Sequence, residues 1–238
     1  MKEFRNLWNR LLTWLYPDVC PFCGRLSEEG VCEACRKKVR LIREPRCKTC
    51  GKPLDRREKE YCADCLKGRH AFREGRSLFL NRAPVSTAIY AFKYQNRRIY
   101  GRYFGKMLAD EFGDFLQKKK VDCIVPVPLH RRRRRVRGYN QAEILALELG
   151  RRTGIPVEKN GLLRVKNTKA QKDLDPVSRR QNMKGAFARR KDWTVPGTVL
   201  LVDDIYTTGS TLDEAARTLL SEGAENVCFL TISIGQGY

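Results

Sequence analysis

No apolar run in the sequence approaches the roughly 18 residues that would indicate a membrane-spanning helix. The first 19 residues also lack the pattern of a secretory signal, because Arg5 and Arg10 interrupt the apolar positions and no small-residue cleavage site follows. We therefore expect a cytoplasmic protein in a reducing compartment. Structural disulfides are rare in such a compartment, so the ten cysteines need another explanation.

Acidic residues are scarce relative to basic ones. The chain of 238 residues has 27 Asp and Glu against 48 Lys and Arg, which gives a formal net charge of +21. The basic excess lies within residues 1–192, whereas residues 193–238 carry a net negative charge. This balance indicates a polyanionic partner, whether nucleic acid, an anionic membrane surface or a phosphorylated small molecule. The 42% of hydrophobic residues excludes a wholly disordered chain.

The chain divides into three parts. Residues 1–19 predict an amphipathic helix, which packs on the rest of the protein or serves a membrane surface or partner. Residues 20–68 hold eight cysteines, residues 66–84 are interpreted as a linker, and residues 85–238 form an α/β domain. Apolar strands that alternate with helices predict a parallel sheet covered on both faces. The expected strands are 85–94, 121–127, 199–202 and 226–234; the expected helices run to 115 and over 140–152 and 210–222; the expected long loop is 164–192.

The eight cysteines form four CxxC pairs, in which two pairs followed by glycine alternate with two that are not. This order indicates an internal duplication. Two CxxC pairs complete a tetrahedral zinc site, and four thiolates leave no position for water, so we expect two structural Zn²⁺ ions. Sequential pairing is the simplest arrangement, and an interleaved one stays open. The expected ligands are Cys20, Cys23, Cys32 and Cys35 for one site and Cys47, Cys50, Cys62 and Cys65 for the other.

The segment 199–212, VLLVDDIYTTGSTL, carries the strongest chemical signal. An apolar strand leads into Asp203 and Asp204, whose carboxylates can accept hydrogen bonds from two adjacent sugar hydroxyls. A loop with hydroxyl side chains then opens a helix, whose first N–H groups favour an anion. No lysine follows the glycine, which excludes a Walker A loop. The candidate phosphate-binding residues are Thr207, Thr208, Gly209, Ser210 and Thr211.

This segment resembles the phosphoribosyl pyrophosphate (PRPP) motif of type I phosphoribosyltransferases. The resemblance implies that Asp203 and Asp204 contact the ribose hydroxyls and that residues 207–211 hold the 5′-phosphate. It also implies that Mg²⁺ accompanies PRPP and bridges its ribose and pyrophosphate. The fold expected from the resemblance is the parallel sheet of that family.

Three other segments are similar to the signature of the ComF family of competence-associated proteins. They are IVPVPLHRRRRRVRGYNQAE at 124–143, FKY at 92–94, and the stretch from Arg164 to GAF at 185–187. Members of that family also carry an N-terminal CxxC zinc region. The family is linked to DNA uptake in natural transformation, so the resemblance implies single-stranded DNA and other DNA-uptake proteins as partners.

Six arginines lie within residues 131–137, more than a pyrophosphate group needs. The excess favours an extended phosphate backbone, although a solvated charged loop stays open. Tyr100, Tyr103 and Tyr139 are candidates for stacking on bases. The candidate ligands for pyrophosphate or DNA phosphate are Lys93, Arg131, Arg132, Arg137, Arg164 and Lys169.

Two functions follow from these features. The first is a protein that binds single-stranded DNA and retains a site for PRPP or a nucleotide. The second is an active phosphoribosyltransferase that transfers phosphoribosyl from PRPP to an unidentified base. The charge, the zinc sites and the family resemblance favour the first, and the two functions are compatible.

Overall fold

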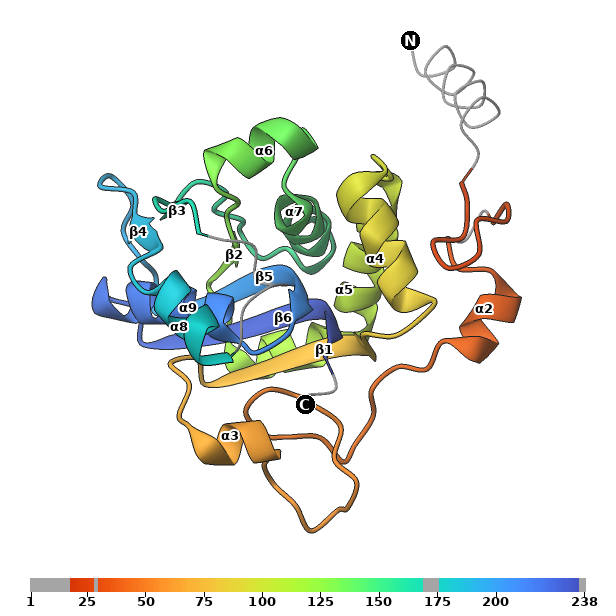
Figure 1. The fold of residues 1–238 in the computed structure, drawn as a ribbon, viewed down its shortest axis with the longest axis horizontal. Helices are drawn as coiled ribbons and strands as arrows, with labels where there is room; N and C mark the ends of the chain where they lie inside the picture. Colours follow the sequence, from red (N-terminus) through yellow and green to blue (C-terminus); the bar gives the residue numbers. More distant parts are fainter. Residues whose placement is uncertain (1–17, 28–29, 169–175, 236–238) are drawn as a thin grey trace.

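The centre of the computed structural model, which describes residues 18–27, 30–168 and 176–235, is a four-stranded parallel sheet (Figure 1). The strand order is β1-β6-β5-β2, and every neighbouring pair is parallel. The expected α/β architecture is therefore confirmed. The strands are β1 (Glu74–Leu80), β2 (Cys123–Pro126), β5 (Thr198–Tyr206) and β6 (Asn226–Ile234).

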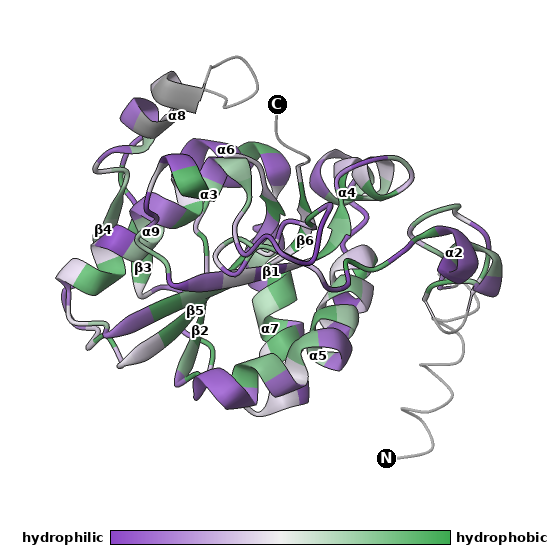
Figure 2. Ribbon diagram, turned by 90° about the horizontal axis from the view of Figure 1, so that it is seen from below, coloured by the Kyte–Doolittle hydropathy of each residue, from purple (hydrophilic) through white to green (hydrophobic). Residues whose placement is uncertain are grey.

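Helices cover both faces of the sheet, as the alternating sequence pattern predicts (Figure 2). Side chains alternate along β5, so Leu200 and Val202 join one core cluster while Val199 and Leu201 join the other. Burying each such side chain contributes about 1.5–3 kcal/mol. One layer holds α4 (Val85–Tyr94), α5 (Ile99–Lys119) and α7 (Gln141–Thr153), and the other holds α9 (Ser210–Ser221).

The two cysteine-rich units pack on different cores. The first unit contains α2 (Glu33–Lys38), and its Phe22 ring packs edge-on against Phe79 at a centroid distance of 5.7 Å. The second unit contains α3 (Ala63–Lys67). The segment after α3 places Phe72 edge-on against Phe229 at 4.8 Å, on the opposite side of the sheet. Figure 1 shows α2 and α3 well separated, so the two units support different layers.

The prediction of a strand at 85–94 is wrong, because these residues form α4. The side chains of Val85, Ala88, Ile89 and Phe92 are buried, and their spacing of i, i+3, i+4 and i+7 is helical. The β-branched and aromatic residues of this segment favoured a strand, but the 3.6-residue period outweighs that propensity.

The interpretation of residues 66–84 as a linker is also wrong, because they contain β1, which pairs with β6 at the edge of the sheet. The strand begins with Glu74, Gly75 and Arg76. Because charged residues and glycine are uncommon in buried strands, the sequence did not predict it.

Two segments for which no helix or strand was predicted contain regular structure. The arginine run forms α6 (Arg131–Arg137), and the ring nitrogen of His130 accepts a hydrogen bond from the backbone N–H of Arg132 (3.3 Å). The long basic segment begins and ends in an antiparallel pair and includes a helix. These elements are β3 (Leu162–Arg164), α8 (Pro176–Met183) and β4 (Phe187–Arg189).

Within the described ranges, no helix has the length and apolar character needed to cross a membrane. The amphipathic helix expected within residues 1–19 falls on residues up to 17, which lie outside the described part of the chain, as does Lys169. The strands predicted at 121–127, 199–202 and 226–234 correspond to β2, β5 and β6, and the predicted helices correspond to α5, α7 and α9.

Candidate functional site

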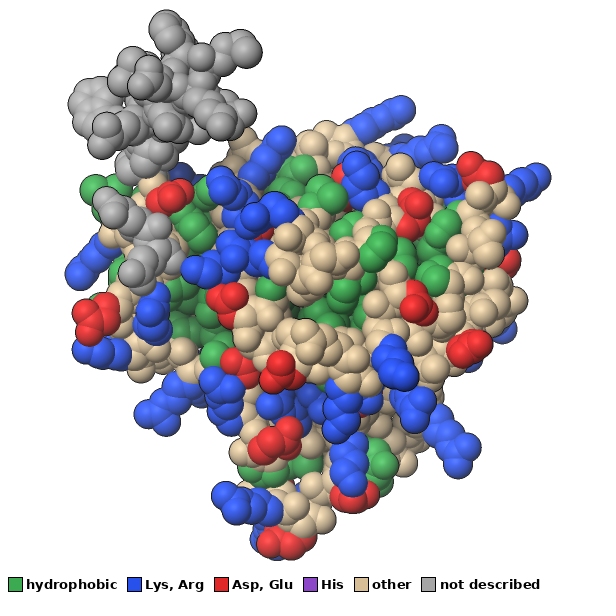
Figure 3. Space-filling view, turned by 180° about the vertical axis from the view of Figure 1, so that it is seen from behind, with side chains coloured by type: hydrophobic (Ala, Val, Ile, Leu, Met, Phe, Trp, Pro, Cys, Tyr) green, Lys and Arg blue, Asp and Glu red, His purple; other side chains and the backbone are tan. Residues whose placement is uncertain are grey.

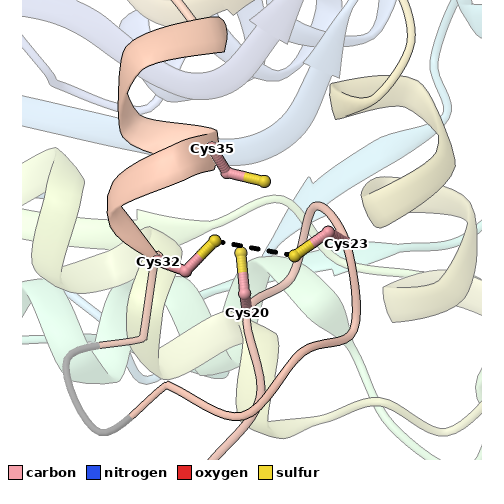
Figure 4. A group of neighbouring side chains, drawn as sticks. All are labelled: Cys20, Cys23, Cys32 and Cys35. Atoms are coloured by element: carbon pink, nitrogen blue, oxygen red, sulfur yellow. Dashed lines mark hydrogen bonds between the residues drawn. The ribbon is translucent and has the colours of Figure 1, made fainter.

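The eight cysteines of the N-terminal region gather in two groups of four. Within each group, the Sγ atoms all lie within 4.8 Å of one another. The grouping confirms the sequential pairing. The first group is Cys20, Cys23, Cys32 and Cys35 (Figure 4), and the second is Cys47, Cys50, Cys62 and Cys65.

The sulfur positions fit tetrahedral zinc. A Zn–S distance of about 2.3 Å requires sulfur atoms about 3.8 Å apart. The Sγ atoms of Cys23 and Cys32 are 3.6 Å apart, and those of Cys50 and Cys62 are also 3.6 Å apart. Each closed set of four sulfurs suits a structural ion.

The expected internal duplication extends to the backbone. The N–H of Gly24 donates to the carbonyl of Cys20 (2.8 Å), and the N–H of Gly51 donates to that of Cys47 (3.0 Å). Both glycines adopt a left-handed conformation, with φ of +72° and +73°. Residues that have a side chain rarely adopt this backbone conformation, so glycine is needed where the chain turns around each metal position.

Asp203 and Asp204 lie inside β5, because the strand continues to Tyr206 instead of ending at the predicted Val202. The backbone N–H of Asp204 donates to Oδ1 of Asp203 (2.8 Å), which fixes the first carboxyl. The Asp204 side chain is largely buried. The end of a buried parallel strand thus presents two adjacent carboxyl groups, at the edge where open α/β sheets bind ligands.

Two cations balance this acidic pair. Lys93 on α4 places its Nζ 2.7 Å from Oδ1 of Asp204, and Arg164 on β3 attracts Asp203. Burial and the neighbouring Asp204 charge nevertheless raise the pKa of Asp203, whereas burial lowers the pKa of Arg164 to about 10. Among the described residues, Nε of Arg164 has no hydrogen-bond partner. Perturbed groups of opposite charge held together in this way are typical of a functional site.

The loop 207–211 connects β5 to the start of α9. Gly209 has φ of +77°, and a Cβ atom there would lie 2.5 Å from the hydroxyl oxygen of Tyr206, so this position requires glycine. The hydroxyl groups of Thr208 and Ser210 are hydrogen-bonded to each other (2.9 Å). The first N–H groups of the twelve-residue α9 have no intrahelical acceptor, so the loop and helix together can bind a phosphate.

Arginines of helix α6 contact the segments that carry Arg164 and Lys93. The guanidinium of Arg133 donates to the carbonyl of Thr168 (2.9 Å), whose hydroxyl accepts from Arg164 (2.5 Å). Arg137 lies over the ring of Tyr94, the residue that follows Lys93 in α4, at 4.9 Å from the ring centroid. The elements around the acidic pair are therefore α4, α6 and β3. We name the residues Lys93, Arg131, Arg132, Arg133, Arg137 and Arg164 the cationic collar.

The structure separates the collar residues into two kinds. Lys93 and Arg164 interact with the acidic pair, whereas Arg131 and Arg132 are exposed on α6 and face solvent. Five of the six collar residues are candidates from the sequence, Arg133 is added by the structure, and the pairing of Lys93 with Asp204 was not predicted. It joins two elements that only the fold brings together.

The tyrosines expected to stack on bases are placed differently. Tyr100 and Tyr139 are buried, and Tyr103 is half-buried beside Gly30, so their rings serve packing. The exposed aromatic residues near the collar are Tyr90 and Tyr94 on α4. Their i, i+4 spacing would have placed the two rings side by side on a helix. Because this segment was predicted as a strand, the sequence analysis did not identify the pair.

Cys123, Cys228 and His70 are not part of either four-cysteine group. Both cysteines are buried in strands of the sheet, as expected for small apolar side chains. His70 lies outside both cysteine groups, and its Nδ1 is 3.5 Å from a carboxylate oxygen of Asp213.

Comparison with known families finds two matches. Residues 11–66 match the double zinc ribbon domain, and residues 108–233 match the phosphoribosyl transferase domain. The first match covers the ligands of both cysteine groups. The second covers β5 and α9, which carry the acidic pair and flank the loop, as well as β2 and most of β6.

Comparison with characterised proteins finds relatives over most of the chain. Competence protein F of Haemophilus influenzae is 35% identical over 85% of this chain and 89% of its own length. The DNA utilization protein YhgH of Salmonella typhi is 31% identical over 89% of this chain and 94% of its own. Competence protein ComFC of Bacillus subtilis is 29% identical over 82% and 80%. With its double zinc ribbon and its phosphoribosyltransferase domain, the chain belongs to the ComF family of competence and DNA-utilization proteins.

Proposed function

We propose that this protein binds single-stranded DNA together with PRPP or another ribose-phosphate ligand, and acts in DNA uptake or utilisation in the cytoplasm. One observation carries the proposal: two adjacent carboxyl groups, one paired with Lys93 and the other attracted by Arg164, precede a loop suited to phosphate. The names of the relatives, which refer to competence and DNA utilization, support the DNA partner.

Each part of the site has a role in binding the ribose-phosphate ligand. Asp203 and Asp204 accept hydrogen bonds from the two ribose hydroxyls, and residues 207–211 bind the 5′-phosphate. Lys93 exchanges its ion pair with Asp204 for the pyrophosphate, and Arg164 binds the same group. Carboxylate oxygens are ligands that Mg²⁺ prefers, so Asp203 and Asp204 suit the ion that accompanies PRPP and offsets its charge.

The exposed part of the collar binds the DNA backbone. Lysine and arginine side chains are spread widely over the surface, as Figure 3 shows for one face, so net charge alone does not locate the strand. Helix α6 differs from the rest because six of its seven residues are arginine and it adjoins the ribose-phosphate site. A flexible strand can follow such a row of cations without sequence preference.

Removing two collar charges should reduce the salt dependence of DNA binding. For single strands, log K falls with log[salt] by about 0.7 per phosphate neutralised. We expect Arg131→Ala with Arg132→Ala to lower this slope by about 1.4, measured by fluorescence anisotropy of a labelled oligothymidylate. The matched control is Arg56→Ala with Arg57→Ala, which removes two exposed neighbouring arginines from the second ribbon. Equal slopes for the two variants contradict the assignment, and wild-type binding without salt dependence contradicts DNA binding by charge.

The phosphoribosyltransferase domain match favours a second function at the same site. In that reaction the bond between C1 of the ribose and pyrophosphate breaks, and a bond from C1 to a base nitrogen forms. Positioning and charge stabilisation carry such chemistry, so no nucleophilic side chain is required. Base-dependent release of pyrophosphate from PRPP tests it, and its absence with every common nucleobase leaves binding as the function.

A further inference from the structure

We propose that Tyr90 and Tyr94 form a stacking site for the bases of single-stranded DNA, beside the cationic collar that holds its phosphates. This inference rests on the proposed function, because it names the surface by which the protein holds the strand. Both tyrosines project from α4, the helix that also carries Lys93.

The rings of Tyr90 and Tyr94 are exposed and do not contribute to the hydrophobic core. Tyr90 is 51% exposed and Tyr94 is 54% exposed, whereas Ile89 and Phe92 on the other face of α4 are buried and fix the helix to the sheet. The ring centroids of the two tyrosines are 4.9 Å apart, with an angle of 48° between the ring planes. Two neighbouring aromatic rings that are each about half exposed suit unpaired bases, because every base has a π-face.

Positive charge borders the aromatic pair. The guanidinium of Arg137 lies 4.9 Å from the ring centroid of Tyr94, which ties α4 to the arginine helix α6. Aromatic rings that alternate with arginines are typical of surfaces that bind single strands, where the rings contact bases and the cations follow the backbone. A double-stranded partner fits less well, because its bases are already stacked on each other.

The stacking site and the acidic pair are neighbours with different tasks. Lys93 follows Tyr90 by three positions on α4 and contacts Asp204, so α4 borders both. Asp203 and Asp204 suit two vicinal hydroxyls, and deoxyribose lacks the 2′-hydroxyl. The DNA strand therefore lies across Tyr90, Tyr94 and α6, while the ribose-phosphate ligand occupies the acidic pair and the loop.

The test compares binding of two oligonucleotides to the full chain. One is a fluorescein-labelled oligothymidylate, and the other is an abasic strand of equal length. We expect Tyr90→Ala with Tyr94→Ala to lower affinity for oligothymidylate at least tenfold at fixed salt, with an unchanged salt slope, because stacking is lost and phosphate contacts remain. The same substitutions should leave affinity for the abasic strand unchanged.

Two controls separate stacking from folding. Tyr90→Phe with Tyr94→Phe keeps the rings and should bind as the wild type does. Tyr61→Ala, at a tyrosine in the second ribbon that is 39% exposed, should also bind as the wild type does. If the alanine variant binds oligothymidylate with wild-type affinity, the stacking site is overturned and the DNA partner is not. The same holds if the variant loses as much affinity for the abasic strand as for oligothymidylate. A wild-type chain that binds neither strand overturns the proposed DNA partner as well.

Discussion

Replacing Asp203 and Asp204 together by asparagine is expected to weaken PRPP binding by at least about 100-fold. Hydrogen bonds to charged acceptors contribute about 1.5–3 kcal/mol each, and every 1.4 kcal/mol is a factor of ten. Asparagine keeps the shape of both side chains but removes the charge that orients the ribose hydroxyls. It also removes the ion pair of Lys93 with Asp204 and the carboxylate charge that attracts Arg164.

Calorimetric titration with PRPP in magnesium buffer measures this loss. The matched control is Asp110→Asn with Asp114→Asn, which removes two exposed carboxylates from α5 and should leave PRPP affinity unchanged. The Asp203 and Asp204 variant should retain its affinity for single-stranded DNA, or bind slightly more tightly, because negative charge is removed. Unaltered PRPP binding by this variant contradicts the ribose assignment.

Loss of zinc from the second ribbon should impair PRPP binding, whereas loss from the first should not. The segment that leaves the second ribbon holds the start of α9, since the N–H of Ala71 donates to Oδ1 of Asp213 (2.6 Å). It also packs Phe72 edge-on against Tyr206 at 6.2 Å, and the Tyr206 hydroxyl lies against Gly209 in the loop. The cysteines of the first ribbon belong to the other core cluster.

Cys47→Ser and Cys20→Ser make this comparison at equivalent positions, because both cysteines are buried and each opens its ribbon. We expect metal analysis to fall from two zinc ions per chain to one in both variants. PRPP affinity should fall at least tenfold for Cys47→Ser and stay within about twofold for Cys20→Ser. Equal PRPP affinity in two folded variants, checked by circular dichroism, contradicts support of the loop by the second ribbon.

The features that lie within one short stretch of chain could be predicted from the sequence. The β5–loop–α9 segment could be predicted from the sequence alone, because an apolar strand, two carboxylates and a glycine loop follow one another in order. Both cysteine groups could also be predicted, because the spacing of the cysteines in each group matches the tetrahedral coordination of one zinc ion. The left-handed glycines at 24 and 51 agree with that reading.

The features that depend on tertiary contacts could not be predicted. β1 is an edge strand with charged residues at its start, so its place beside β6 follows only from the assembled sheet. The pairing of Lys93 with Asp204 needs α4 to be a helix packed near the end of β5, and local β propensity pointed the other way. The exposed Tyr90 and Tyr94 were hidden for the same reason.

We propose that one chain holds a ribose-phosphate ligand and a DNA strand at neighbouring sites. In a calorimetric test, the wild-type protein is first saturated with PRPP in magnesium buffer and then titrated with a single-stranded oligonucleotide. We predict one-to-one binding of PRPP, followed by binding of the strand to the PRPP-loaded protein. No binding of PRPP at millimolar concentration, or loss of strand binding once PRPP is bound, would contradict it.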